Sequence, residues 1–142
     1  MVGGQMLDIE GETHFLTERA IADMHAMKTG ALIRAAVRMG ALLGGASETE
    51  LGQLTAYAEA AGRAFQLADD ILDVTATAEA MGKKTGKDAG QGKQTLVARI
   101  GVDAARRRLG EMIHDALSAL LPFGDDAEGL RATARFFAER ES

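Results

Sequence analysis

Three aspartates inside an otherwise apolar stretch are the residues of this sequence best suited to chemistry. Asp69, Asp70 and Asp73 belong to the segment Q-L-A-D-D-I-L-D, and no lysine or arginine stands three or four residues from them. Asp69 and Asp73 are four residues apart, so they fall on one face of a helix and repel each other. Grouped carboxylates suit Mg²⁺, which keeps several waters and takes substrate phosphates as further ligands. A solvated acidic face is the alternative, but the apolar flanks favour a metal site.

Lysines beside glycines supply charge of the opposite sign. Lys83 and Lys93 each follow a glycine in a basic, glycine-rich segment directly after the aspartates. Their ammonium groups suit phosphate oxygens, although an ordinary surface loop has the same composition. Lys28 falls on the apolar stripe of its segment. It either points into a polar cavity, with Asp8 as a counter-ion, or extends along the edge of the stripe.

The elements that position these groups are predicted to be helices. Alanine and leucine dominate, aromatic residues make up 4%, and no segment alternates long enough to suggest a strand. Such a composition favours closely packed helices over a sheet. Pro122 separates the last two predicted helices, and a short turn at 76–81 leads into the basic loop. The predicted helices cover residues 18–43, 48–74, 95–100, 102–121 and 126–140.

Local signals fix the ends of these helices. Thr17 can cap the first, Gly44 and Gly45 end it, and Ser47 with Glu50 forms a capping box for the second. Gly30 lies inside the first helix, where glycine costs about 1 kcal/mol relative to alanine. This predicts a bend or a close backbone approach. The apolar stripe of the first helix is expected to comprise Ile21, His25, Lys28, Leu32, Ala35, Met39 and Leu42.

Composition excludes several classes of function. The net charge of −5 argues against nucleic acid as the main partner. The absence of cysteine excludes disulfides and thiolate metal sites. No apolar run reaches the roughly 18 residues of a membrane span, and no signal peptide is evident, so we expect a cytoplasmic protein. We expect one helical domain over residues 1–142. The opening residues look as though they start inside an element, with a frayed terminus as the alternative.

These motifs together resemble the trans-isoprenyl diphosphate synthases of the farnesyl and geranylgeranyl type. The D-D-I-L-D segment with its flanks is highly specific, and the spacing of the weaker motifs supports it. Only the second of the two aspartate-rich motifs of this family is found, so the chain resembles the C-terminal half. The resemblance is carried by G-G-Q-M-L-D at 3–8, H-A-M-K-T-G at 25–30, G-R-A-F-Q-L-A-D-D-I-L-D-V at 62–74, G-K at 82–83, G-K-D at 86–88 and G-K-Q-T at 92–95.

The resemblance implies a helical bundle around a central cavity and a prenyltransferase reaction. An allylic diphosphate ionises and isopentenyl diphosphate attacks the carbocation, with Mg²⁺, or Mn²⁺ in its place, on the departing diphosphate. By resemblance, the metal ligands are Asp69, Asp70 and Asp73. The diphosphate-binding residues are Lys28, Lys83, Lys93 and Gln66. The groups facing the developing cation are Thr29, Gln66 and the Lys28 carbonyl, and the cavity is lined by Gln5 and Asp8.

Three interpretations are compatible with these residues. The first is one half of a prenyltransferase, inactive or nearly so alone, which exposes an apolar surface and forms a homodimer or assembles with the missing N-terminal half. The second is a non-catalytic helical partner of a full synthase. The third is a fragment of a terpene cyclase, whose second metal motif mixes Asn, Ser and Glu. The retained carboxylates and Lys28 favour the first, and no motif of the third type follows Asp73.

Overall fold

The computed structural model describes residues 1–11, 17–82 and 95–139, without the side chains at positions 8, 18 and 77–82. Every regular element within these ranges is a helix, which confirms the all-α prediction. In chain order the elements are α1 (Val2–Gly11), α2 (Glu18–His25), the π-helical turn η1 (Ala26–Gly30), α3 (Ala31–Leu43), α4 (Glu48–Gly82), α5 (Leu96–Ile100), α6 (Val102–Ala119), the 3₁₀ segment η2 (Leu121–Ala127) and α7 (Glu128–Glu139).

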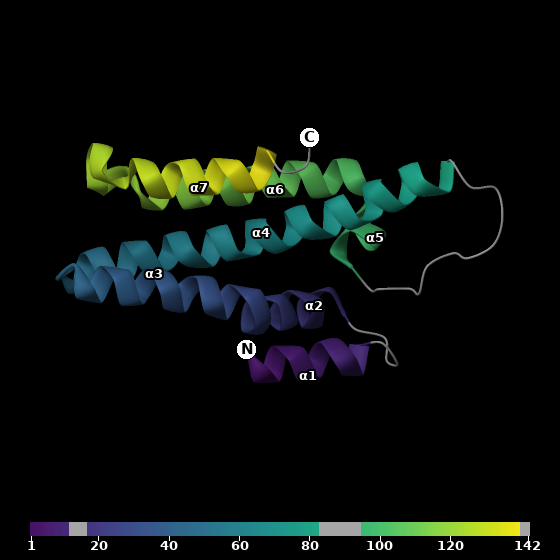
Figure 1. The fold of residues 1–142 in the computed structure, drawn as a ribbon, viewed down its shortest axis with the longest axis horizontal. Coiled ribbons are helices and arrows are strands. Elements are labelled where there is room, and N and C mark those ends of the chain that lie inside the picture. The colour runs from purple at the N-terminus through teal and green to yellow at the C-terminus, as the bar shows by residue number, and fades with distance from the viewer. Residues whose placement is uncertain (12–16, 83–94, 140–142) are drawn as a thin grey trace.

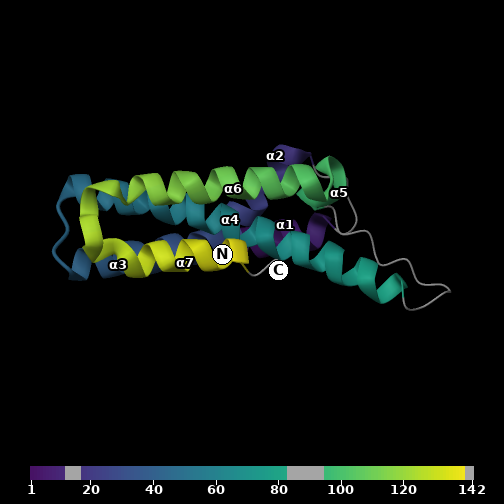
Figure 2. The same ribbon diagram turned by 90° about the horizontal axis from the view of Figure 1, so that it is seen from above.

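The helices are stacked in layers around α4. In Figure 1, α6 and α7 lie on one side of α4, α2 and α3 lie on the other side, and α1 lies farthest from α6. Figure 2 shows α6 and α7 side by side, so together they form one layer. α4 contacts α3, η1, α5, α6 and α7, whereas α1 packs on α2 and η1. Thr29 and Gln66, two of the residues with predicted chemistry, meet where η1 packs on α4.

Alanine builds the core between α4, α6 and α7. On α4 the buried residues include Ala58, Ala61, Ala64 and Ala68, and none of these four side chains is more than 1% exposed. Small side chains let helix backbones approach closely, and larger buried side chains fill the space around them. The largest side chains in this part of the core are Tyr57, Ile71, Leu120 and Val97.

The predicted helix ends are confirmed at three positions. Thr17 Oγ1 accepts a hydrogen bond from Ala20 N at the start of α2. Gly45 has a φ of 77° after α3, a conformation that glycine adopts without strain. The Ser47 hydroxyl and backbone N–H both donate to Glu50 Oε2 at 2.7 Å. Because the ionised carboxylate accepts both bonds, the pKa of Glu50 is lowered.

α3 and α4 form an antiparallel pair with regular side-chain contacts. Arg38 Nη1 donates to Thr55 Oγ1 at 2.7 Å, and Arg34 Nη1 lies 3.3 Å from Glu59 Oε1. Farther along, Gly62 meets Gly30, and Thr29 bonds Gln66. This pairing fixes the register of the K-T-G turn against the aspartates of α4.

Two sequence predictions about helices were wrong. The helix beginning at Glu48 does not end at residue 74 with a separate turn, but runs unbroken to Gly82. Its last turns extend past α6 and α7 (Figure 2), so they need no continuous apolar stripe, and alanine maintains the helix. The helix at 18–43 is not uniformly α-helical either, because η1 interrupts it.

The π turn also changes which face of α3 is buried. The predicted stripe put Leu32, Met39 and Leu42 inward, but they are 54%, 59% and 58% exposed. Ile33 and Val37 pack against the core instead. An extra residue in one turn rotates all following side chains by about 100°. The inward residues of α3 are therefore Ile33 and Val37 and not the predicted Leu32, Met39 and Leu42.

Candidate functional site

The K-T-G motif lies on the π turn η1, where three helices meet. η1 packs against α1 on one side and α4 on the other. Lys28 and Thr29 are both half-buried there. π-helical turns often occur at functional sites, since they direct side chains and backbone groups in ways a regular α-helix does not. The close backbone approach predicted as one possibility at Gly30 is confirmed by Gly62, and the turn sets Lys28 and Thr29 between α1 and α4.

A series of hydrogen bonds connects this turn to the aspartates. Thr29 Oγ1 donates to Gln66 Oε1 at 3.2 Å, and Gln66 Nε2 donates to Asp70 Oδ1 at 3.2 Å. The first bond joins residues 37 positions apart in the sequence. Because its two ends are engaged on opposite sides, the Gln66 amide has a defined orientation. The structure thus brings Thr29, Gln66 and Asp70 together, and their roles toward substrate and metal stay predictions.

The three aspartates have different environments. Asp70 is 6% exposed and accepts the Gln66 bond, whereas Asp69 is half-buried and Asp73 is exposed. The described residues include no three histidine or acidic side chains close enough to hold a metal ion by themselves. Mg²⁺ commonly takes only one or two carboxylates, with water and phosphate oxygens completing the octahedron. Asp69 and Asp73, on one helical face and accessible to solvent, fit that donor set.

Other predicted site residues are placed only in part. Gln5 is exposed on α1, and Asp8 belongs to the same helix, but its side chain lies outside the description. Lys83 and Lys93 lie outside the described residues. Their predicted contact with diphosphate therefore stays a prediction.

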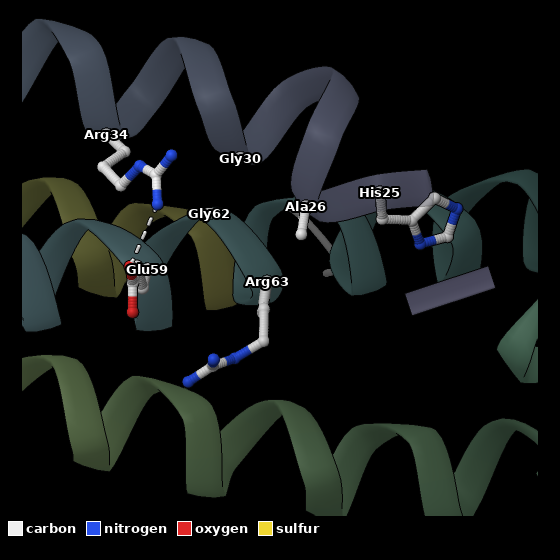
Figure 3. A pocket seen from close by; sticks show the side chains of 7 residues that line it. All are labelled: His25, Ala26, Gly30, Arg34, Glu59, Gly62 and Arg63. Atoms are coloured by element: carbon white, nitrogen blue, oxygen red, sulfur yellow. Dashed lines mark hydrogen bonds and ion pairs between the residues drawn. The ribbon is translucent and has the colours of Figure 1, made fainter. Parts of the chain in front are cut away.

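A hollow of about 260 Å³ lies beside the point where η1 crosses α4. Figure 3 shows Arg34 and Glu59 joined across it, with Gly30 and Gly62 at the crossing and Arg63 on the α4 side. The Arg34–Glu59 ion pair is about half exposed, so it contributes at most roughly 1 kcal/mol. This hollow was not predicted from the sequence. Charged residues separated by 25 positions show their proximity only once α3 and α4 are paired.

Two buried glycines next to the K-T-G turn were also missed. Gly4 is buried on α1, where it lies against the backbone of η1. Gly62 is buried on α4, where that helix crosses η1 at Gly30. A sequence signal was present for both, because a glycine in a helix interior is unfavourable unless close packing requires it. From the sequence, a bend or a close backbone approach was predicted at Gly30 but not at Gly4 or Gly62.

With this geometry established, the comparisons with known proteins decide the family. A model of the family "Polyprenyl synthetase" matches residues 1–119. The chain belongs to the polyprenyl synthetase family. The match includes the GGQMLD segment, the K-T-G turn and the aspartates of α4, so it covers every candidate residue named above.

Individual relatives support the polyprenyl synthetase assignment. The farnesyl diphosphate synthase of Escherichia coli (strain K12) is 41% identical over 99% of this chain and 48% of its own length. The geranylgeranyl diphosphate synthase of Cyanophora paradoxa is 37% identical over all of this chain and 48% of its own length. The chain therefore spans about half the length of these curated relatives.

Solved structures agree with the fold of this polyprenyl synthetase chain. An FPP/GFPP synthase from Zymomonas mobilis superposes with a TM-score of 0.81 at 32% identity, covering 96% of this chain and 45% of that one. A geranyltransferase from Legionella pneumophila superposes with a TM-score of 0.80 at 26% identity. The superposition covers 99% of this chain and 44% of that one. Among the described residues, none of the helices has the length and apolarity needed to cross a bilayer.

Proposed function

We propose that this chain is the diphosphate- and Mg²⁺-binding half of a prenyltransferase that condenses isopentenyl diphosphate with an allylic diphosphate. The observation that supports this most is the Thr29–Gln66–Asp70 series. It joins the K-T-G turn to the aspartate-rich helix, two motifs distant in sequence. A helical scaffold needs neither clustered carboxylates nor a lysine on a π turn beside them.

In this proposal the aspartates have two roles. Asp69 and Asp73 hold Mg²⁺ together with diphosphate oxygens, because they share a face of α4 and are reached by solvent. Asp70 accepts from Gln66 and keeps that amide in place, with its second oxygen directed to the metal directly or through water. When bound, Mg²⁺ stabilises the negative charge that develops on the departing diphosphate.

The residues of η1 act on the two ends of the allylic substrate. The Lys28 ammonium group binds the diphosphate, with Lys83 and Lys93 as further cations outside the described residues. The Thr29 hydroxyl oxygen, the Gln66 amide oxygen and the Lys28 carbonyl face the developing allylic cation, which their partial negative charges stabilise. Gln5 and Asp8 line the same cavity from α1.

Binding measurements test this function without requiring turnover. Calorimetric titration with inorganic diphosphate is expected to give binding that requires Mg²⁺. Asp69→Ala should weaken this binding at least about tenfold, or roughly 1.4 kcal/mol. Its unfolding free energy should change by less than about 1 kcal/mol, since the side chain is partly exposed. Asp115→Ala, an exposed carboxylate on α6, is the matched control and should leave binding unchanged.

A well-folded chain that binds no diphosphate in the presence of Mg²⁺ would favour the alternative function, a non-catalytic helical partner of a full synthase. Equal losses of binding and of stability in Asp69→Ala would instead assign that carboxylate a structural role. We expect the isolated 142-residue chain to bind diphosphate but not to turn over, because it spans half the length of its relatives.

We also propose an assembly surface on α3. The outer α3 face consists of Leu32, Met39, Leu42 and Leu43, which are 54%, 59%, 58% and 90% exposed. A contiguous apolar stripe on one helix marks an interaction surface. In a complete synthase this face packs on the remainder of the bundle. In the isolated chain, a second copy covers it.

A further inference from the structure

We propose that Gly4 and Gly62 are positioning residues for the K-T-G turn, holding Lys28 and Thr29 from opposite sides. The inference rests on the proposed function of those two residues. Neither glycine touches substrate in this proposal. Each acts by letting a helix backbone come closer to η1 than any side chain would allow.

Gly4 sets the approach of α1. A Cβ atom built at Gly4 would lie 2.5 Å from Lys28 N, 2.7 Å from Met27 C and 2.9 Å from Lys28 Cα. All three are backbone atoms, so no side-chain rotation relieves the clash. Carbon atoms in contact ordinarily lie about 3.5–4.0 Å apart. An alanine here therefore displaces either α1 or the backbone of Lys28 itself.

Gly62 sets the approach of α4 from the other side. A Cβ atom at Gly62 would lie 3.1 Å from Gly30 Cα, again a backbone atom. A Cβ atom at Gly30 would not be crowded in the same way. A Cβ at Gly30 would have its nearest neighbour at 3.5 Å, the carbonyl oxygen of His25, which is an ordinary contact distance. Alanine should therefore be tolerated at Gly30, whereas at Gly62 it requires η1 to move by a few tenths of an ångström, although both glycines lie at the same crossing (Figure 3).

The Thr29–Gln66 hydrogen bond depends on the distance between η1 and α4. Thr29 Oγ1 and Gln66 Oε1 are 3.2 Å apart, at the long end of the hydrogen-bond range. A separation of α4 from η1 by a few tenths of an ångström breaks this bond. Gln66 then loses one of the two contacts that orient its amide, and Lys28 moves with the turn.

The chain contains matched controls for both positions. Gly3 lies on α1 next to Gly4, and Gly52 lies on α4 before Gly62, and a Cβ at either meets nothing within 4 Å. Gly→Ala at these two sites makes the same change in helix propensity without crowding η1. Any difference between Gly3→Ala and Gly4→Ala, or between Gly52→Ala and Gly62→Ala, therefore reports the close approach alone.

Nuclear magnetic resonance on the ligand-free chain tests the proposal directly. Gly4→Ala and Gly62→Ala should shift the backbone amide resonances of Ala26–Gly30, and Gly62→Ala should also shift the side-chain amide of Gln66. Gly3→Ala, Gly52→Ala and Gly30→Ala should leave the Gln66 side-chain amide in place. Urea unfolding confirms that each variant is folded. If Gly62→Ala does not fold, Gly4→Ala still tests the proposal, because α1 packs mainly on α2 and η1 and lies outside the core around α4.

Titration with inorganic diphosphate and Mg²⁺ provides the functional measurement. Gly4→Ala and Gly62→Ala should raise the dissociation constant by about tenfold or more, as loss of supporting contacts does at other metal sites. Unchanged η1 amides in both variants would overturn the positioning role, whatever the binding result. Shifted amides in a chain that binds no diphosphate even as wild type would instead remove the proposed function and leave the positioning role standing.

Discussion

The two faces of α4 are built on different principles. The face toward α6 and α7 is made of alanines and large buried aliphatic side chains, and it encloses its own core. The face toward η1 and α3 carries Gln66, which bonds Asp70, and is crossed by a glycine contact. It lies next to α3, whose outer face is exposed and apolar. One helix thus serves stability on one side and, in the proposed function, ligand binding on the other.

This difference indicates where the chain tolerates change. Side chains on the α6 and α7 face contribute through burial, so their removal lowers the unfolding free energy. In the proposed function, side chains on the opposite face contact ligands or further protein, so their removal should change binding or assembly with little effect on unfolding. The following substitutions test that separation.

The largest expected loss of stability follows Ile71→Ala. Ile71 is completely buried in the core, and truncation of such a side chain typically costs about 2–5 kcal/mol because it leaves a cavity. Leu32→Ala is the matched comparison on the outer α3 face and should cost under about 0.5 kcal/mol. Urea unfolding followed by circular dichroism measures both. Similar losses at the two positions would contradict the division between the faces.

A smaller loss is expected for Tyr57→Phe. Tyr57 OH donates to the Leu130 carbonyl oxygen at 2.8 Å, joining α4 to α7, and removal of a bond of this kind costs about 1–2 kcal/mol. Burial raises the pKa of the Tyr57 hydroxyl. The resulting stabilisation is present below the unfolded-state pKa near 10 and is lost as the pH rises through the folded-state pKa. Alkaline unfolding of Tyr57→Phe should lack this contribution, and an identical pH profile in both proteins would argue against it.

Substitution on the outer α3 face should change assembly rather than stability. Leu32→Gln combined with Met39→Gln reduces the apolar surface, so self-association measured by multi-angle light scattering should fall. The unfolding free energy should change by less than about 0.5 kcal/mol per site. A wild-type chain that remains a clean monomer at high concentration would argue against this face as an interaction surface.

The smallest effect is expected at the start of α4. Because the pKa of Glu50 is lowered by its bonds with Ser47, its stabilising contribution is present above the unfolded-state value. That contribution is lost as the pH falls through the lower, folded-state pKa. Acid titration of helicity should show this loss in the wild type and not in Glu50→Gln. Parallel curves would mean that the capping box adds nothing to helix stability.

Much of this arrangement could be predicted from sequence because its causes are local. Helix type follows from the period of apolar residues, and Thr17, Ser47 and Gly45 mark helix ends by bonds to nearby backbone. The aspartate cluster was recognisable from its apolar flanks and motif. The π turn was not, because a π turn leaves no distinct period in the sequence. Consequently the predicted inward positions of α3 were wrong, and the distinct environment of Asp70 was not foreseen.

The short connection at residues 44–47 has a consequence for how this site forms. The side-chain bonds that join α3 and η1 to α4 span 17, 25 and then 37 positions, so we expect each to form after the one nearer the turn has shortened the remaining loop. Closing loops of this size is fast and loses little chain entropy. The Thr29–Gln66 bond is therefore the last of the series to close. A chain cleaved within 44–47 would have to regain it by a bimolecular encounter, at a rate that depends on protein concentration.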